Sequence, residues 1–219
     1  MNMRLLCLLL LALALASAGI VSAQTPHTHE HGFAGAENWA KVFDDPARDE
    51  WQKPHEVITA LGLAADAKVA DIGAGTGYFA ARLANMTPQG RVYAVDIEPD
   101  MVTYLAERAR REGLTNLQAV QAKPDDPALP EKVDCVLVVD TYHHISDRVS
   151  YFRRLRQRLM PNAQVAIIDF TVDSPVGPPK SGRLPPSQVS DELKAAGYKQ
   201  VAQHSFLPYQ YFLVFRAGK

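Results

Sequence analysis

The sequence predicts an α/β fold: a doubly wound, mostly parallel sheet of seven strands, with helices on both faces and a C-terminal antiparallel hairpin. One observation is a regular alternation of short apolar runs with helical segments, which is typical of parallel sheets. Another is the run "KVDCVLVVD" (132–140), whose continuous apolar character is expected of a strand buried on both faces. The third is the turn "GAGTG" (73–77), which directly follows the apolar run 67–72.

The other elements follow from the same patterns. Strands are expected where branched and aromatic residues lie between turn residues, and helices where apolar residues recur every three or four positions. The predicted strands cover residues 67–72, 91–97, 116–122, 132–140, 163–170, 199–206 and 209–216. The predicted helices lie near residues 54–62, 78–86, 99–113, 149–159 and 187–198. The Pro-rich stretch 171–186 is too long for a plain connector, and we expect it to act as a lid.

Residues 1–23 have the features of an export signal. A short positive start precedes an apolar run, and Val21 and Ala23 occupy the small-residue positions of a cleavage site. Cleavage after Ala23 would leave 196 residues, enough for one domain, in the periplasm or secreted. The alternative is a membrane anchor, because residues 5–23 carry no charge and are long enough to span a bilayer.

The predicted domain covers residues 45–219, and residues 24–44 are expected to be a flexible segment that precedes it. His27, His29 and His31 alternate there, which makes a metal-handling protein one alternative. The favoured interpretation is a solvated tail, with no residue assigned to a metal.

Composition favours a small-molecule partner. The formal net charge is −1, so no basic excess indicates nucleic acid binding. Of the two cysteines, Cys7 lies in the leader and Cys135 in an apolar run, so the exported chain is expected to hold no internal disulfide and Cys135 to be a core residue. The oligomeric state is left open.

The glycine spacing indicates what the turn binds. Dinucleotide-binding chains use G-x-G-x-x-G, but here Tyr78 takes the third glycine position and the spacing is G-x-G-x-G. Asp71, two residues before the glycines, would repel a pyrophosphate and attract an ammonium or sulfonium. Asp96, at the end of the second strand, is placed to accept ribose hydroxyls. The ligand is therefore expected to have a ribose and a positive charge.

On these residues the sequence resembles the class I S-adenosylmethionine-dependent methyltransferases, over residues 50–216. "VADIGAGTGYF", "VYAVDIEPDM", "QAKPDDPALP" and "VDTYHHISD" are similar to four motifs of that family, in order. The resemblance implies S-adenosylmethionine as the cofactor, held by Asp71, Gly73, Gly75, Gly77, Asp96, Ile97, Asp125, Asp140 and Thr141. It also implies that Tyr142, His143 and His144 face the substrate. One departure is Asn162 and Ala163, where the family usually has glycines before the fifth strand.

The expected reaction is direct displacement at the methyl group, onto a small organic acceptor. His143 or His144 is placed to act as a base if the acceptor must lose a proton. The alternative is that both histidines are structural, and that Tyr142 is a core aromatic instead of a pocket residue.

An export signal is unusual for an enzyme whose cofactor is made in the cytoplasm, so two other functions stay open. One is a non-catalytic exported protein that uses the same pocket for a nucleoside, or the histidine-rich tail for a metal. The other, ranked below it, is an NAD-dependent oxidoreductase, which Tyr78 at the third glycine position disfavours.

Overall fold

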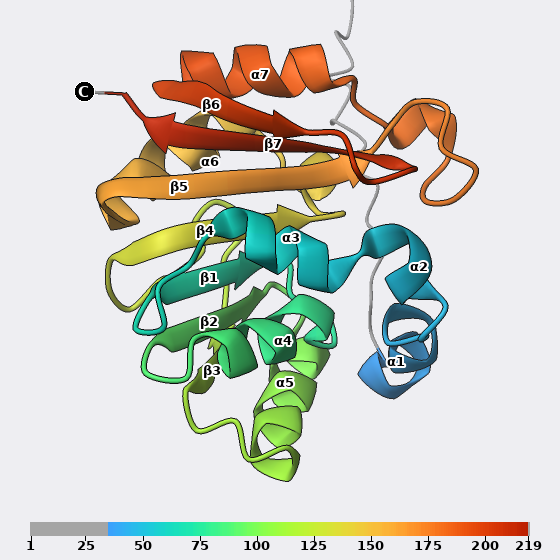
Figure 1. Cartoon of the computed structure of the whole chain (residues 1–219), viewed down its shortest axis with the longest axis vertical. Coiled ribbons are helices and arrows are strands. Elements are labelled where there is room, and N and C mark those ends of the chain that lie inside the picture. Colours follow the sequence, from blue (N-terminus) through green and yellow to red (C-terminus); the bar gives the residue numbers. More distant parts are fainter. Residues whose placement is uncertain (1–34, 219) are drawn as a thin grey trace, which may run out of the picture.

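The computed structural model describes residues 35–218 and contains a single sheet of seven strands (Figure 1). The strand order is β3-β2-β1-β4-β5-β7-β6, in which β1 to β5 are parallel and β7 runs antiparallel to both of its neighbours. The strands are β1 (Lys68–Ile72), β2 (Arg91–Asp96), β3 (Leu117–Gln121), β4 (Val133–Val139), β5 (Leu159–Phe170), β6 (Tyr198–His204) and β7 (Gln210–Ala217). The predicted fold class is confirmed.

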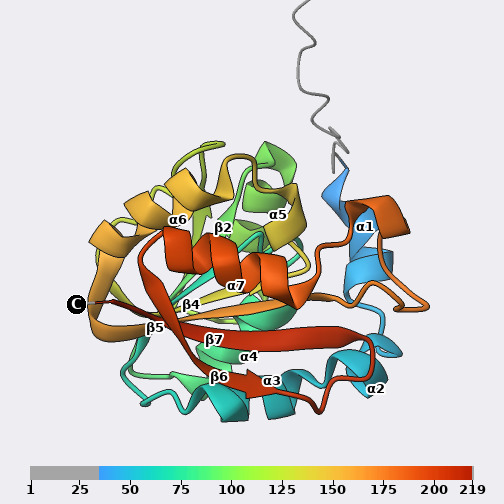
Figure 2. The same ribbon diagram turned by 90° about the horizontal axis from the view of Figure 1, so that it is seen from above.

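Helices cover both faces of this sheet. In the view from above, α3 and α4 lie on one side of the strands, and α6 and α7 lie on the other (Figure 2). The helices are α1 (Ala36–Phe43), α2 (Arg48–Gln52), α3 (Pro54–Leu61), α4 (Tyr78–Met86), α5 (Pro99–Arg111), α6 (Arg148–Leu155) and α7 (Pro186–Ala195). Short 3-10 turns are η1 (Tyr142–His144), η2 (Arg156–Arg158) and η3 (Lys180–Gly182).

The core consists of two apolar layers, one on each face of the central strands. Along β4, Leu137 belongs to one layer and Val136 to the other, and both side chains are fully buried. A buried residue of this size contributes about 2 kcal/mol relative to an exposed one. Cys135 lies in the same strand, and burial raises the pKa of its thiol to about 12. It is a core residue, as the apolar run predicted.

The segment 36–43 differs from the prediction of a flexible stretch, because it forms α1. Trp39 and Phe43 are four positions apart and stack with ring centroids 5.2 Å apart. The backbone N–H of Gly35 donates to a carboxylate oxygen of Asp100 on α5 (3.0 Å). The few apolar residues of α1 thus pack onto the domain. The sequence offers no clear sign of this helix, because polar residues surround them.

Strand β5 begins four residues earlier than predicted. Leu159 pairs with Val133, and the register between β4 and β5 shifts before Cys135 pairs with Gln164. Asn162 takes a φ of 66° within this irregular stretch, a left-handed conformation that Asn tolerates better than most residues. The chain therefore takes this left-handed conformation at position 162 without a glycine.

Within residues 35–218, no helix has the length and apolarity required to cross a bilayer. The predicted leader 1–23 and the histidines His27, His29 and His31 lie outside the described residues.

Candidate functional site

The glycine-rich loop after β1 can be built only with glycine at its contact points. Gly73 has a φ of 75°, and a Cβ at this position would overlap the side chain of Thr141. Gly77, with a φ of 93°, begins α4, and a Cβ there would lie 2.8 Å from Leu105 of α5. The loop therefore packs closely against the end of β4 on one side and against α5 on the other. Its glycines leave the main chain without covering side chains.

Asp96, at the end of β2, is hydrogen-bonded to the main chain of this loop. Its carboxylate accepts the N–H of Gly75 (2.8 Å) and the N–H of Glu98 (3.0 Å), and only 8% of the residue is exposed. Burial raises the pKa of this carboxyl, which the two N–H donors partly offset. Ile97 follows with 48% of its surface exposed, an apolar surface beside the carboxylate. Both residues lie at the end of β2, as the sequence predicted, and their contacts with a cofactor stay a prediction.

Two more aspartates at this edge of the sheet have carboxyl pKa values well above the usual range. Burial raises the pKa of Asp71, at β1, to about 7, and the nearby charge of Asp96 adds to the rise. Burial raises the pKa of Asp140, directly after β4, to about 7 as well, although Arg48 and His143 oppose the shift. Parallel strands bring their carboxyl ends to one edge, and this edge therefore favours a ligand with positive charge.

A ring of side chains that the sequence analysis missed joins α2 to the sheet. The Nε of Arg48 donates to Gln52 (2.9 Å), whose amide donates to the side chain of Gln210 (2.8 Å). Gln210 in turn donates to Asp140, and the ring closes through the Arg48 guanidinium and Asp140 (3.3 Å). Because these residues are separated by up to 162 positions, no local pattern could have revealed the ring.

The first two helices cover the glycine-rich loop. The ring of Phe43 comes within 3.3 Å of the place that a Cβ of Gly75 would take. Arg108 of α5 donates to the carboxylate of Asp44 (2.9 Å) and to the carbonyl of Thr76 (3.0 Å), which fixes α1 over the loop. The loop after β5 lies beside α2 (Figure 1), and Trp51 packs with a centroid distance of 6.0 Å against Phe170, where that loop begins.

A histidine and an aspartate pair at the ends of β4 and β5. The Nδ1 atom of His143 lies 2.9 and 3.0 Å from the two carboxylate oxygens of Asp169, and the His143 backbone N–H approaches the same carboxylate (3.3 Å). Both side chains are buried, with 6% and 3% of their surfaces exposed. His144 is exposed, and its ring centroid lies 4.1 Å from that of His143. The sequence singled out both histidines, but Asp169 was not foreseen.

Two predicted contacts are not assembled with the rest. Tyr142 is fully buried among core residues, and its hydroxyl donates to Glu192 of α7 (2.7 Å). The expectation that it faces the substrate is therefore wrong, and the alternative of a core aromatic holds. The side chain of Asp125 is 70% exposed and lies 3.7 Å from Arg154. Its role in holding the cofactor stays a prediction.

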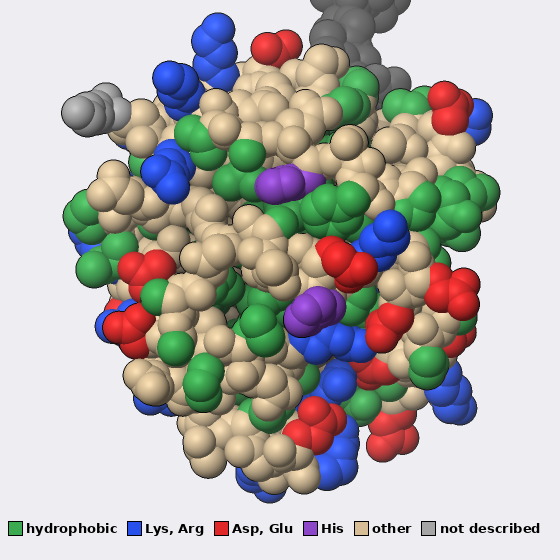
Figure 3. Space-filling model, in the orientation of Figure 1, with side chains coloured by type: hydrophobic (Ala, Val, Ile, Leu, Met, Phe, Trp, Pro, Cys, Tyr) green, Lys and Arg blue, Asp and Glu red, His purple; other side chains and the backbone are tan. Residues whose placement is uncertain are grey.

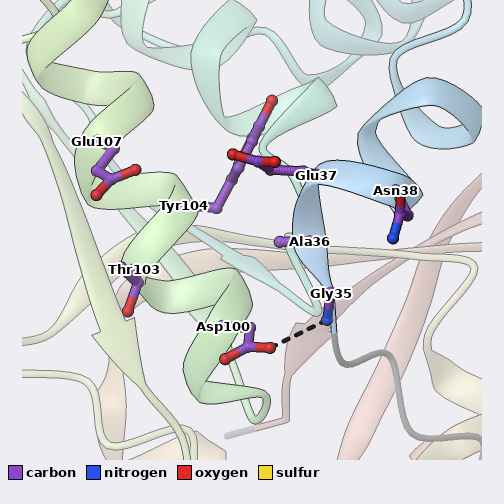
Figure 4. A pocket seen from close by; sticks show the side chains of 8 residues that line it. All are labelled: Gly35, Ala36, Glu37, Asn38, Asp100, Thr103, Tyr104 and Glu107. Atoms are coloured by element: carbon purple, nitrogen blue, oxygen red, sulfur yellow. Dashed lines mark hydrogen bonds between the residues drawn. The ribbon is translucent and has the colours of Figure 1, made fainter.

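A separate hollow of about 350 Å³ lies between α1 and α5 (Figure 4). Its wall includes Glu37, Asp100 and Glu107, and the Gly35–Asp100 hydrogen bond closes one end. The hollow is on the outer side of the helices and contains none of the strand-end carboxylates. No cluster of three or more His, Cys, Asp or Glu residues suited to a metal occurs between residues 35 and 218.

Charge is mixed on the visible surface. On the face shown in Figure 3, lysine and arginine side chains are interspersed with aspartate and glutamate. This distribution is in keeping with the net charge of −1. Exclusion of nucleic acid as a partner stays a prediction.

The comparison with known families gives one match. Residues 69–162 match a family described as "Methyltransferase domain". This stretch runs from β1 to the turn within β5, so it contains the glycine-rich loop, Asp96, Asp140 and His143.

Individual relatives agree with this match. The chain is 26% identical over 133 residues to the malonyl-acyl-carrier-protein O-methyltransferase of Acetivibrio thermocellus, which is 60% of this chain and 46% of that protein. It spans about half the length of the curated relatives it matches. A SAM-dependent methyltransferase from Aquifex aeolicus has a TM-score of 0.76 at 27% identity, covering 82% of this chain and 97% of that one. The (4+2)-cyclase SpnF shares the fold alone, with a TM-score of 0.64 at 15% identity over 76% of this chain and 80% of that one.

Proposed function

We propose that this chain, which carries a class I methyltransferase domain, transfers a methyl group from S-adenosylmethionine to a small organic acceptor. The observation that carries the proposal is the convergence of Asp71, Asp96 and Asp140 on a bare glycine loop at one edge of the sheet. Buried carboxylates without enough positive charge around them favour a cationic ligand.

The residues at this edge fit the cofactor in their chemistry. S-adenosylmethionine carries a sulfonium and an ammonium, and the raised pKa values of Asp71 and Asp140 support a site that gains from such charges. A carboxylate has about four lone-pair positions. Asp96 uses two of them for backbone N–H groups, which leaves others for a ribose diol. Ile97 offers apolar surface for an adenine.

When bound, S-adenosylmethionine supplies a methyl group that its sulfonium already activates. The chain's part is to hold the cofactor and the acceptor in line and to exclude water, which contributes about 7 to 11 kcal/mol in well-aligned reactions. The cover formed by α1 and α2 serves the second purpose, because Phe43 and Arg48 lie over the loop and over Asp140.

A second function on the same fold has one observation in its favour. The likeness to a cyclase shows that this architecture also carries chemistry other than methyl transfer. A protein with another ligand would have no need for two buried acids, Asp71 and Asp96, at the positions that suit a sulfonium and a ribose. Methyl transfer is therefore the better supported proposal.

We also propose that the chain is exported, on the strength of the charge, apolar run and small residues in 1–23. Fractionation of cells that express the full chain, with mass analysis of its N-terminus, tests this location. Mature protein beginning at Gln24 in the periplasm or medium is the expected result. An intact N-terminus in the membrane fraction would support the anchor, and an intact N-terminus in the cytoplasm would contradict both.

Calorimetric titration of S-adenosylmethionine and its demethylated product into the full chain tests the cofactor. We expect a Kd in the micromolar range, or about −8 kcal/mol. Asp96→Ala should weaken binding by about 100-fold, because the ribose loses a charged acceptor. Asp66→Ala is the matched control, since Asp66 is exposed and remote from the loop. A folded sample that binds neither compound would contradict the proposal.

A further inference from the structure

The pairing of His143 with Asp169 fixes both the ring and the backbone of the histidine. Asp169 accepts the main-chain N–H of His143 (3.3 Å) and faces Nδ1 at 2.9 Å. It also accepts the backbone N–H of Phe170 (2.8 Å). A carboxylate that accepts from several N–H groups is best completed by another donor, so the proton of the neutral imidazole belongs on Nδ1. The lone pair of the ring is then on Nε2.

The Nε2 atom of His143 differs from Nδ1 in its contacts. Among residues 35–218 it has no protein hydrogen-bond partner, whereas Nδ1 has two carboxylate oxygens. The groups that face His143 are Asp169 of β5, Asp140 at the end of β4 and the neighbouring ring of His144. The charge of Asp140 also ties His143 to the edge that carries the proposed cofactor residues.

A second polar group is buried near this pair without a partner. Tyr211 of β7 lies directly opposite Asp169 in the β5–β7 ladder, and its residue is only 4% exposed. Its hydroxyl has no hydrogen-bond partner within the described part of the chain. Burial raises the pKa of this hydroxyl, and the charges of Asp169 and Asp140 add to the rise, so it stays a protonated donor. A buried O–H of this kind normally meets an acceptor atom.

We propose, building on the methyl transfer argued above, that the acceptor is a neutral hydroxyl group, that His143 takes its proton and that Asp169 is a positioning residue. The hydroxyl oxygen bonds to the methyl carbon as the carbon–sulfur bond breaks, and the electron pair of that bond stays on sulfur. The hydroxyl proton passes to Nε2 of His143 and is later released to solvent. No further co-reactant is required.

The alternatives fit these residues less well. An aromatic amine attacks with a lone pair that it already has, and a thiol ionises near neutral pH by itself, so neither needs a buried base. A carboxylate acceptor needs no base either, and it would meet like charges at Asp140 and Asp169. A neutral hydroxyl makes use of an imidazole whose position a carboxylate fixes.

The state of the ring can be measured without knowing the acceptor. Long-range proton–nitrogen correlation spectra of the full chain, labelled at histidine and saturated with the demethylated cofactor, report which nitrogen carries the proton. We expect His143 to be the Nδ1–H form, with the lone pair of the ring on Nε2. Asp169→Asn should shift the tautomer, whereas His144→Gln should leave it unchanged. An Nε2–H form in the wild type would overturn the proposal.

The class of acceptor is tested with 4-nitrophenol, whose anion absorbs in the visible range. At about pH 6 the free probe is mainly neutral, so a base at the site should raise its anion band on binding to the protein loaded with the demethylated cofactor. His143→Gln should abolish the band and Asp169→Asn should weaken it. Binding of 4-nitroaniline or 4-nitrobenzoate in preference to the phenol would overturn the hydroxyl assignment.

Calorimetry of S-adenosylmethionine on the same preparations distinguishes failure of the hydroxyl proposal from failure of the methyl-transfer proposal. If the cofactor binds and the tautomer is the opposite one, the hydroxyl proposal fails and the methyl-transfer proposal stands. If the cofactor does not bind, the methyl-transfer proposal fails, whatever the ring of His143 shows. His143→Gln is expected to leave the cofactor affinity within twofold of the wild type.

Discussion

The two halves of the strand-end edge are built in different ways. The half at β1 and β2 uses main chain and acids from one short stretch, residues 71–96, and its shape depends on glycines that nothing else can replace. The half at β4, β5 and β7 uses side chains from distant segments, such as Arg48, His143, Asp169 and Gln210. In the proposed function, the first half would hold the cofactor and the second half would face the acceptor.

The largest expected effect of a substitution is at Gly73, in the half at β1 and β2. Gly73→Ala should destabilise the fold by about 3 kcal/mol, because the new Cβ adds a clash with Thr141 to the strain of a φ of 75°. Gly62→Ala is the matched control: its φ is 59°, but a Cβ there has no neighbour within 4 Å, so only about 1 kcal/mol is expected. Urea unfolding measures both. Equal losses would show that the contact with Thr141 contributes nothing.

This difference between the halves also explains what the sequence could predict. A main-chain cradle requires glycines at fixed spacing, so Gly73, Gly75, Gly77 and Asp96 could be placed from the sequence at once. The parallel strands were equally visible, because burial on both faces requires continuous apolar runs such as 133–139.

Side-chain networks leave no such signal. Gln52 and Gln210 are ordinary polar residues until the fold buries them against each other, and Asp169 is one more acid at a strand end. Tyr142 was misplaced for the same reason, since its distance from the strand end is correct but its ring turns toward Phe152 and the core. Local periodicity does not show which way a side chain in a 3-10 turn points.

Arg48 joins the two halves, and its removal should have the second largest effect. Arg48→Met leaves Asp140 buried with one neutral partner, Gln210, and should cost about 2 kcal/mol. Arg82→Met is the comparison, because both guanidinium groups lie over the ring of Tyr78, at 4.4 and 4.0 Å. Arg82 pairs with the exposed Asp49, so about 0.5 kcal/mol is expected there. Thermal or urea unfolding that gave equal losses would contradict a junction role for Arg48.

Binding of a cationic ligand at the strand-end edge should depend on pH. Asp71 and Asp140 have pKa values of about 7, so they are partly protonated below neutral pH, and a cationic ligand favours their ionised forms. If one carboxyl must ionise, the affinity for S-adenosylmethionine should fall about tenfold between pH 8 and pH 6. The demethylated product lacks the sulfonium charge and should show a smaller change. Calorimetry in buffers of different ionisation enthalpy should detect proton release, and pH-independent binding would contradict the assignment.

The smallest effect should come from Asp71→Asn, and its sign is the informative part. The folded pKa of about 7 lies above the unfolded value of 3.8, so this carboxyl lowers stability as the pH rises from about 4 to above 7. The variant should therefore be more stable than the wild type by about 1 kcal/mol at pH 8, with no gain below pH 4. A buried amide keeps part of the desolvation cost, which limits the gain. If the proposed function holds, the same variant should bind the cofactor less tightly, because it loses a charge that would face the sulfonium and the ammonium. Urea unfolding at the two pH values decides the sign, and a loss of stability at pH 8 would show that Asp71 supports the fold instead of the ligand.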